Sequence, residues 1–235
     1  MMSNRNWSAG TLRLAEISAC ELLRWGRDRF PDGTVAVSSS FQTQSVPLLH
    51  LVAATAPELP VLFVDTGYHF PETLRFRDQL AEEFGLNLRV LKITAESGVR
   101  SVEAPYRTNP DLCCEVRKVQ PVQQAMREYR GWISGIRRDQ SSTRAAAQVV
   151  EESDRGLVRI HPLLEWTHAD VMHYIRKYNL PSHPLTARGY TSIGCLPCTR
   201  LPTVPDDPRS GRWQGHTKTE CGLHTKLRGS TRESE

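Results

Sequence analysis

The strongest constraint on the fold is an alternation of strand-like and helix-like patterns between residues 34 and 91. Short apolar runs typical of buried strands alternate with longer segments whose apolar residues recur at helical spacing, in the order 34–37, 44–56, 60–64, 71–84 and 88–91. Pro71 suits the first turn of its helix, because a backbone N–H would be unsatisfied there. This order of strands and helices predicts a parallel sheet with right-handed crossovers.

The alternation continues with weaker signals. Two further helices and two short strands are expected, over 115–129, 132–135, 157–160 and 167–178. Thr167 is a suitable N-cap for the last of these helices. Apolar residues at helical spacing around Cys20 predict an N-terminal helix, in which Cys20 is a small buried residue. We therefore expect an α/β protein with a doubly wound, mostly parallel sheet.

The C-terminal part has a different character. Beyond Pro181, prolines and glycines interrupt nearly every short stretch, which predicts a mostly irregular tail. Positive residues gather from Arg200 onward and at Arg137 and Arg138, and the formal net charge is +4. Such a mild positive balance favours a small anionic ligand over a long polyanion such as a nucleic acid.

The compartment in which the chain resides determines whether its cysteines stay reduced. No stretch reaches the roughly 18 uninterrupted apolar residues of a membrane span, and residues 1–10 lack the basic and then apolar order of a secretory signal. We expect a cytoplasmic protein without a membrane partner, in which cysteines stay reduced. For the five cysteines other than Cys20, metal binding or catalysis is therefore a better expectation than disulfide formation.

Three loops with polar side chains follow predicted strands, at 38–45, 65–67 and 135–144. The first offers hydroxyls and backbone N–H groups at a helix start, which suits a phosphate, although it lacks the glycines and lysine of a Walker loop. The second suits a ribose or a base edge. The third carries three arginines, whose guanidinium groups suit phosphate and sulfate oxygens: Arg137, Arg138 and Arg144. Helix-entry turns and an arginine-rich surface loop are the simpler alternatives, but ligands of open α/β sheets lie beyond the carboxyl ends of the strands, so we expect the loops to converge on one crevice.

Four cysteines form two pairs, with Cys113 next to Cys114 and a Cys-x-x-Cys at Cys195 and Cys198. Four thiolates predict zinc or an iron–sulfur cluster. Zinc sites usually separate paired ligands by roughly two to four residues, whereas adjacent cysteines point apart and more easily bind two different metal atoms. The adjacent pair therefore favours an iron–sulfur cluster, with zinc and unligated thiols as alternatives.

Cys221 stands apart, near the end of the tail. It cannot be a fifth ligand to a site that already has four. His224 and the basic residues Lys218, Lys226 and Arg228 favour its thiolate, which is the reactive form of a cysteine. Taken alone, Cys221 is either a nucleophile or a spare thiol.

As a set, these motifs resemble the assimilatory adenylyl-sulfate and phosphoadenylyl-sulfate reductases over about residues 34–225. The resemblance is carried by the serine loop at 38–45, Asp65-Thr66-Gly67-Tyr68, Phe70-Pro71-Glu72-Thr73, Cys113-Cys114 with Arg117-Lys118, residues 135–141, His183-Pro184-Leu185, Gly189-Tyr190, Cys195 to Arg200, Arg209 to Trp213, and Glu220-Cys221-Gly222-Leu223-His224. So many separated motifs do not agree by chance.

The resemblance implies an adenine-nucleotide α-hydrolase-like fold and a reaction in two halves. The Cys221 thiolate attacks the sulfur of the nucleotide's sulfate, which expels an adenosine phosphate and leaves an S-sulfocysteine; thioredoxin or a similar dithiol protein then releases sulfite. It also implies a [4Fe-4S] cluster without redox turnover on Cys113, Cys114, Cys195 and Cys198. On this interpretation, residues 1–185 are a nucleotide-binding α/β domain with an N-terminal helix, and residues 186–235 are a cluster-binding loop and a flexible tail with the catalytic cysteine.

The substrate-binding residues are expected in the strand-end loops, after the cysteine pair and in the tail: Ser38, Ser39, Ser40, Phe41, Asp65, Thr66, Gly67, Lys118, Arg137, Arg138, Gln140, Arg209, Arg212 and His224. Two features disagree about a 3′-phosphate on the nucleotide. Family members with the four cysteines mostly use adenylyl sulfate (APS), whereas the segments 38–41 and 70–73 look more like those of clusterless phosphoadenylyl-sulfate (PAPS) enzymes. A cluster site needs four coordinated substitutions, so we expect APS as the substrate, with PAPS or both as alternatives.

Two other classes of protein remain as weaker hypotheses. A zinc-containing, ATP-dependent sulfur transferase would need a loop of the Ser-Gly-Gly-x-Asp-Ser type, and residues 38–45 contain no glycine or aspartate. A zinc-stabilised module that binds nucleic acid through its basic tail is disfavoured by the modest positive charge. The oligomeric state, including a homo-oligomer, stays open.

Overall fold

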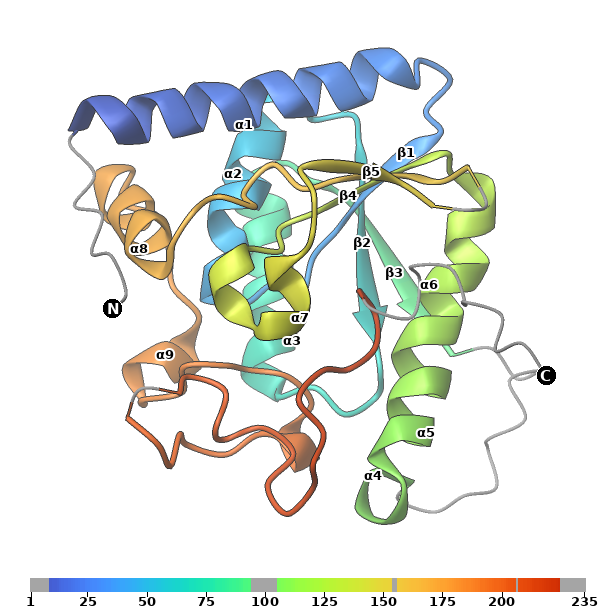
Figure 1. Ribbon diagram of the computed structural model, residues 1–235, viewed down its shortest axis with the longest axis vertical. Coiled ribbons are helices and arrows are strands. Elements are labelled where there is room, and N and C mark those ends of the chain that lie inside the picture. Colours follow the sequence, from blue (N-terminus) through green and yellow to red (C-terminus); the bar gives the residue numbers. More distant parts are fainter. Residues whose placement is uncertain (1–8, 94–104, 154–155, 206, 225–235) are drawn as a thin grey trace.

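The computed structural model describes residues 9–93, 105–153, 156–205 and 207–224. Within these residues the strands form a six-stranded sheet in the order β3-β2-β1-β4-β6-β5 (Figure 1). The strands are β1 (Val35–Ser38), β2 (Pro60–Asp65), β3 (Asn87–Lys92), β4 (Gly131–Ser134), β5 (Val150–Glu152) and β6 (Val158–Ile160). All neighbouring strands are parallel except β5 and β6, which are antiparallel. The predicted mostly parallel sheet is confirmed.

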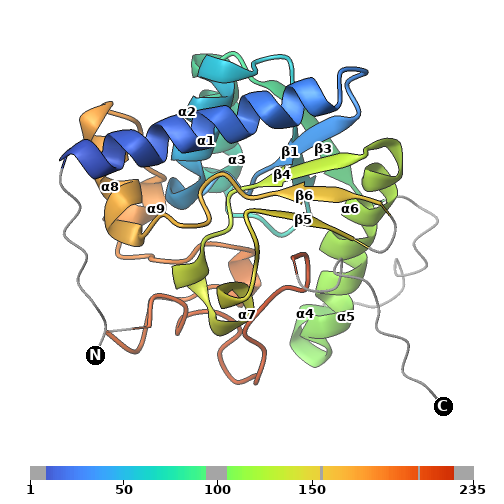
Figure 2. The ribbon, with the colours of Figure 1, turned by 45° about the horizontal axis from the view of Figure 1, so that its top comes forward.

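Helices cover both faces of this sheet (Figure 2). On one face lie α1 (Ala9–Arg29), α2 (Val46–Thr55), α3 (Pro71–Glu83) and α8 (His168–Lys177), whose apolar residues form the main core with Val35 and Val37 of β1. Ala36 points to the opposite face, because successive residues of a strand alternate in direction, and packs there with Trp132 and Val122. The fold is therefore doubly wound, as expected, and Cys20 packs against the main core.

A long helical stretch passes through the adjacent cysteines. It consists of α5 (Pro110–Cys114), a π-helical turn (Glu115–Val119), α6 (Gln120–Ala125) and a 3-10 turn (Met126–Glu128). It begins earlier than the predicted 115–129, because the Asn109 side chain caps it by accepting the Leu112 N–H at 2.9 Å. Pro121 has no N–H to donate to the carbonyl of Arg117, which explains the widened turn. The cysteine pair thus lies on a helix and not in a loop.

One other expectation is confirmed, and one strand was missed. Thr167 caps α8 through a reciprocal pair of bonds with Asp170, of 3.2 Å and 2.7 Å. The strand β5 was not predicted, because Val-Glu-Glu is too short and too polar to carry a strand pattern.

The chain beyond Pro181 is mostly loop in its described part, as predicted. It contains the short helix α9 (Pro184–Ala187) and a 3-10 turn (Leu196–Cys198). These loops cross the carboxyl end of the sheet beside α5 (Figure 1). No helix in the described ranges is long and apolar enough to cross a membrane.

Candidate active site

A large cleft of about 760 Å³ opens at the carboxyl ends of β1, β2 and β4. Its walls include Ser38 at the end of β1, Val64 near the end of β2, and Ser134 and Gly135 at the end of β4. This volume suits a nucleotide-sized ligand. The expected convergence of strand-end loops on one crevice is confirmed for the first and third loops.

The serine loop lines the cleft with hydroxyls and not with its phenylalanine. Ser38, Ser39 and Ser40 face the cleft. Ser39 accepts the Phe41 N–H at 3.1 Å, and Ser38 accepts the Trp132 indole N–H at 2.8 Å. Phe41 has a φ of 51° and its side chain is fully buried against Phe63, so this side chain does not line the cleft.

The neighbouring side chains of Arg137 and Arg138 in the third loop point in different directions. Arg137 lines the cleft and is almost fully buried, with its guanidinium bonded to Asp139 at 3.0 Å and to Gln44 at 2.7 Å. Arg138 instead turns away to Glu165 at 2.9 Å and to backbone carbonyls, so it does not line the cleft either. A sequence cannot show which way neighbouring side chains of a loop point.

Two more polar side chains of this loop reach the cleft. Gln140 faces it and accepts the backbone N–H of Arg137 at 3.1 Å. Arg144, the third arginine of the loop, also lines the wall. The third loop therefore presents Arg137 and Arg144, rather than Arg137 and Arg138, to a ligand.

The tail forms the opposite wall. Cys221, His224, Arg209 and Arg212 all line the cleft, as expected of a nucleophile and of anion-binding residues. Glu220 lies there as well, although sequence reasoning did not single it out, because a carboxylate is unexpected where anions bind. It forms ion pairs with Arg144 at 3.1 Å and Arg209 at 3.4 Å. Burial would raise the pKa of Glu220, but these two arginines hold it below its usual range.

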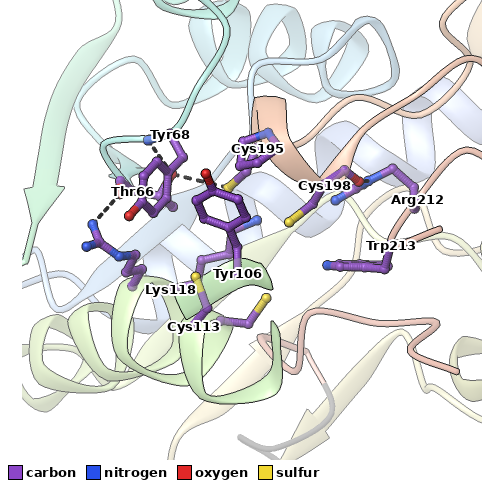
Figure 3. A pocket seen from close by; sticks show the side chains of 12 residues that line it. Thr66, Tyr68, Tyr106, Cys113, Lys118, Cys195, Cys198, Arg212 and Trp213 are labelled. Atoms are coloured by element: carbon purple, nitrogen blue, oxygen red, sulfur yellow. Dashed lines mark hydrogen bonds between the residues drawn. The ribbon is translucent and has the colours of Figure 1, made fainter. Parts of the chain in front are cut away.

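A second, much smaller cavity adjoins this cleft (Figure 3). It is lined by Cys113, Cys114, Cys195 and Cys198, so the fold brings the two cysteine pairs to one place. The side chains of Cys113, Cys195 and Cys198 point into this space in Figure 3. As the side chains stand, no three His, Cys, Asp or Glu groups in the described part of the chain are arranged to hold a metal ion.

Burial changes the acidity of two of these thiols. Burial, together with the thiols of Cys114, Cys195 and Cys198, raises the pKa of Cys113 to about 11. Burial likewise raises the pKa of Cys114 to about 11. Such a donor set becomes anionic when a metal supplies compensating positive charge.

Thr66 belongs to this smaller cavity and not to the large cleft. Its hydroxyl lies 3.2 Å from the Cys195 sulfur, and its carbonyl accepts a bond from Arg117 at 2.9 Å. The Asp65 carboxylate accepts the N–H of Gly67 at 2.9 Å, which shapes the turn. The segment 65–67 was expected to contact the nucleotide in the cleft. It lies beside the cysteines instead.

Lys118, Arg212 and Trp213 line both cavities and form the wall between them. The Arg212 guanidinium lies 4.3 Å from the centre of the Trp213 ring. Burial lowers the pKa of the Lys118 ammonium, but Coulomb attraction to Cys195, Cys221 and Cys114 in their thiolate forms outweighs this effect and raises it overall. The wall is therefore cationic, with four cysteines on one side and Cys221 on the other.

Known proteins share this architecture. The chain is 41% identical over 226 residues to an adenosine 5'-phosphosulfate reductase of Rhodococcus erythropolis, with 92% of each chain covered. It is 43% identical over 197 residues to a phosphoadenosine 5'-phosphosulfate reductase of Gloeobacter violaceus, which covers 81% of this chain and 82% of that protein. A crystal structure of PAPS reductase from Candida auris is similar, with a TM-score of 0.68, 26% identity and coverage of 84% of this chain and 100% of the other.

A more distant protein shares the fold alone. FMN adenylyltransferase of Candida glabrata is 18% identical, with a TM-score of 0.62 over 86% of this chain and 70% of the other. This places the sheet among adenine-nucleotide α-hydrolase-like folds, as predicted. The model of the phosphoadenosine phosphosulfate reductase domain matches residues 34–201. The chain therefore belongs to the phosphoadenosine phosphosulfate reductase family.

Proposed function

We propose that the protein is an adenylyl-sulfate reductase of sulfate assimilation, which converts APS to sulfite and AMP. The observation that carries this proposal is the position of Cys221, which lines the nucleotide-sized cleft beside a cationic wall. The relative from Rhodococcus erythropolis, matched over 92% of both chains, bears the name of this activity.

In the first half-reaction, the Cys221 thiolate attacks the sulfur of the APS sulfate group. A bond forms between the two sulfur atoms, and the bond from sulfur to the bridging phosphate oxygen breaks. AMP leaves with the electron pair of that bond, and Cys221 becomes an S-sulfocysteine. Lys118, Arg209 and Arg212 supply fixed positive charge for the sulfonyl and phosphate oxygens as charge builds up.

In the second half-reaction, one thiolate of a dithiol protein such as thioredoxin attacks the Cys221 sulfur. The bond between the two sulfurs of S-sulfocysteine breaks, sulfite leaves, and a mixed disulfide forms. The second thiol of the partner resolves this disulfide and restores the Cys221 thiol. The partner therefore supplies the two electrons, which fits a reducing cytoplasm.

We assign a [4Fe-4S] cluster to Cys113, Cys114, Cys195 and Cys198. Four soft sulfur donors around one cavity fit an iron–sulfur cluster. The cavity wall also contains the buried indole N–H of Trp213, which has no hydrogen-bond partner among the described residues and suits a sulfur acceptor. When bound, the cluster would offset the charge of the four thiolates and hold the tail to α5, while the Lys118 ammonium would lie between the cluster and Cys221.

The remaining assignments follow from the cleft. We propose that residues 1–185 bind the nucleotide, and that residues 186–235 supply two of the cluster ligands and carry the catalytic cysteine. The side chains assigned to the substrate are Ser38, Ser39, Ser40, Lys118, Arg137, Gln140, Arg209, Arg212 and His224.

APS is preferred to PAPS because the four cysteines are present and converge. Identity does not separate the two substrates, since the PAPS reductase of Gloeobacter violaceus is as similar as the APS reductase of Rhodococcus erythropolis. Protein purified without air should form sulfite from APS with thioredoxin, and more slowly from PAPS. Absence of sulfite from both nucleotides would refute the proposed function.

A further inference from the structure

The short tail segment that carries Cys221 is attached to the domain on both sides of that residue. On one side, the Glu220 carboxylate accepts a bond from the Ser141 hydroxyl at 2.9 Å and forms ion pairs with Arg144 and Arg209. The side chains of Glu220 and Arg144 are only 10% and 11% exposed. One carboxylate thus joins the tail to the third strand-end loop.

Arg209 strengthens this attachment from within the tail. Its guanidinium also donates to the carbonyl of Thr219 at 2.8 Å, so that two consecutive residues before Cys221 are held by one side chain. Arg144 is itself fixed by a bond to Gln140. These arginines are therefore not free side chains that meet Glu220 by chance, since other contacts orient them toward it.

On the other side of Cys221, the tail rests on the sheet. The His224 ring stacks on Trp132, with 5.4 Å between the ring centres and an angle of 16° between the planes. Its carbonyl accepts a bond of 3.0 Å from Arg159, which is almost fully buried and paired with Glu151 at 3.1 Å. Leu223 packs against the apolar cluster around Trp132. Cys221 therefore lies between the ion-paired Glu220 and the stacked His224.

The charge of Glu220 identifies its task. A carboxylate in the wall of a cleft for an anionic nucleotide repels that ligand, so Glu220 does not contribute to substrate binding by its charge. It gains the Arg144 cation and the Ser141 hydroxyl only when the tail lies in the cleft. Its contacts therefore favour the docked tail over the detached one.

We infer that Glu220 is a positioning residue, which holds Cys221 in the cleft by binding Arg144 and Arg209 together. The reaction that this placement serves is that of the proposed function, but the docking itself depends only on the contacts above. Glu220 does not contact the reacting atoms, and its effect reaches them through the backbone of its neighbour.

The test is the rate at which Cys221 reacts with iodoacetamide in the whole holoprotein, followed by peptide mass spectrometry. Glu220→Gln keeps the size of the side chain and removes its charge, and we expect alkylation of Cys221 to become roughly tenfold faster. Glu16→Gln is the matched control, because Glu16 is similarly buried and pairs with Lys177 at 2.9 Å outside the cleft. This control should leave the alkylation of Cys221 unchanged.

Kinetics give a second readout that a general loss of structure would not produce. Glu220→Gln frees two arginines for the nucleotide, so the KM for APS should stay the same or fall, while kcat falls roughly tenfold because Cys221 is placed less often. Glu220→Asp retains the charge and should recover part of kcat. If the wild type forms no sulfite, the proposed function fails, but the alkylation test still decides the role of Glu220.

Two results would overturn the inference. One is equal alkylation of Cys221 in the wild type, Glu220→Gln and Glu16→Gln. The other is a Glu220→Gln protein in which Cys20 becomes reactive together with Cys221, because this would show general destabilisation in place of tail release.

Discussion

The small cavity with four cysteines and the large cleft with Cys221, which are separated by Lys118, Arg212 and Trp213, are built in different ways. The small cavity takes its sulfurs from the helix α5 and from a 3-10 turn, where backbone hydrogen bonds fix each position. The large cleft takes Cys221 from an irregular segment held by side-chain contacts. Ligands of a resident cofactor need one fixed geometry, whereas a nucleophile that meets first a nucleotide and then a protein partner needs two positions. The difference in construction matches this difference in task.

The largest effect is expected from a substitution in the small cavity lined by the four cysteines. In Cys195→Ser the proposed cluster would lose one of its four ligands, so we expect bound iron and inorganic sulfide to fall close to zero. Sulfite formation should fall at least about a hundredfold, because loss of mere outer-shell partners of a metal already costs about 10- to 100-fold. Iron analysis and the visible absorption spectrum measure the first quantity. Full iron content in this variant would show that the cavity does not hold the cluster.

The second prediction concerns the wall itself. Lys118→Ala removes a fixed positive charge from the cleft, and we expect kcat to fall about 10²- to 10³-fold. Iron content should be retained, since no ligand is lost. If iron is lost in proportion to activity, Lys118 serves the cysteine cavity alone, and the division between the two regions is wrong.

These regions differ in how far the sequence predicts them. The alternation from 34 to 91 was sufficient for the sheet, because buried parallel strands and amphipathic helices have distinct periodicities. The convergence of the four cysteines could be expected from the resemblance. The directions of Phe41 and Arg138 could not, because a loop has no periodicity from which side-chain direction can be deduced. Glu220 was missed because its importance arises from Arg144, a residue distant in sequence.

The third prediction is a pH dependence confined to the tail. Burial and the cations Arg144 and Arg159 hold the pKa of docked His224 well below 6.5, whereas a detached tail returns it to about 6.5. A lowered pKa means that the docked state binds fewer protons, so docking is strongest above pH 6.5 and weakens as the pH falls. Between pH 7.5 and 5.5, hydrogen exchange of the amides of 219–224, corrected for intrinsic rates, should quicken about tenfold.

His224→Phe is the control for this effect, because it keeps a ring for Trp132 and cannot titrate. His161, which also faces His224, has a pKa of about 4 and does not change charge in this range. Corrected exchange in the wild type that is independent of pH would contradict the buried, neutral state of His224.

The smallest effect is expected at the remaining cysteine. Cys20 packs on the main core away from both cavities, and burial raises the pKa of its thiol. Cys20→Ala should lower the free energy of unfolding by about 1 kcal/mol and leave iron content and sulfite formation unchanged. Thermal denaturation and the two assays test this. A loss of iron or of activity would assign Cys20 a role that its position does not explain.

The central claim is that Cys221 alone accepts the sulfo group, while the other four cysteines of the site only bind the cluster. Its most direct test is incubation of the anaerobic holoprotein with APS in the absence of any thiol, followed by peptide mass spectrometry. The account predicts a gain of one SO3 group on the peptide that contains Cys221, and loss of this adduct when reduced thioredoxin is added. An adduct on any other cysteine, or sulfite formation by Cys221→Ser at the wild-type rate, would contradict it.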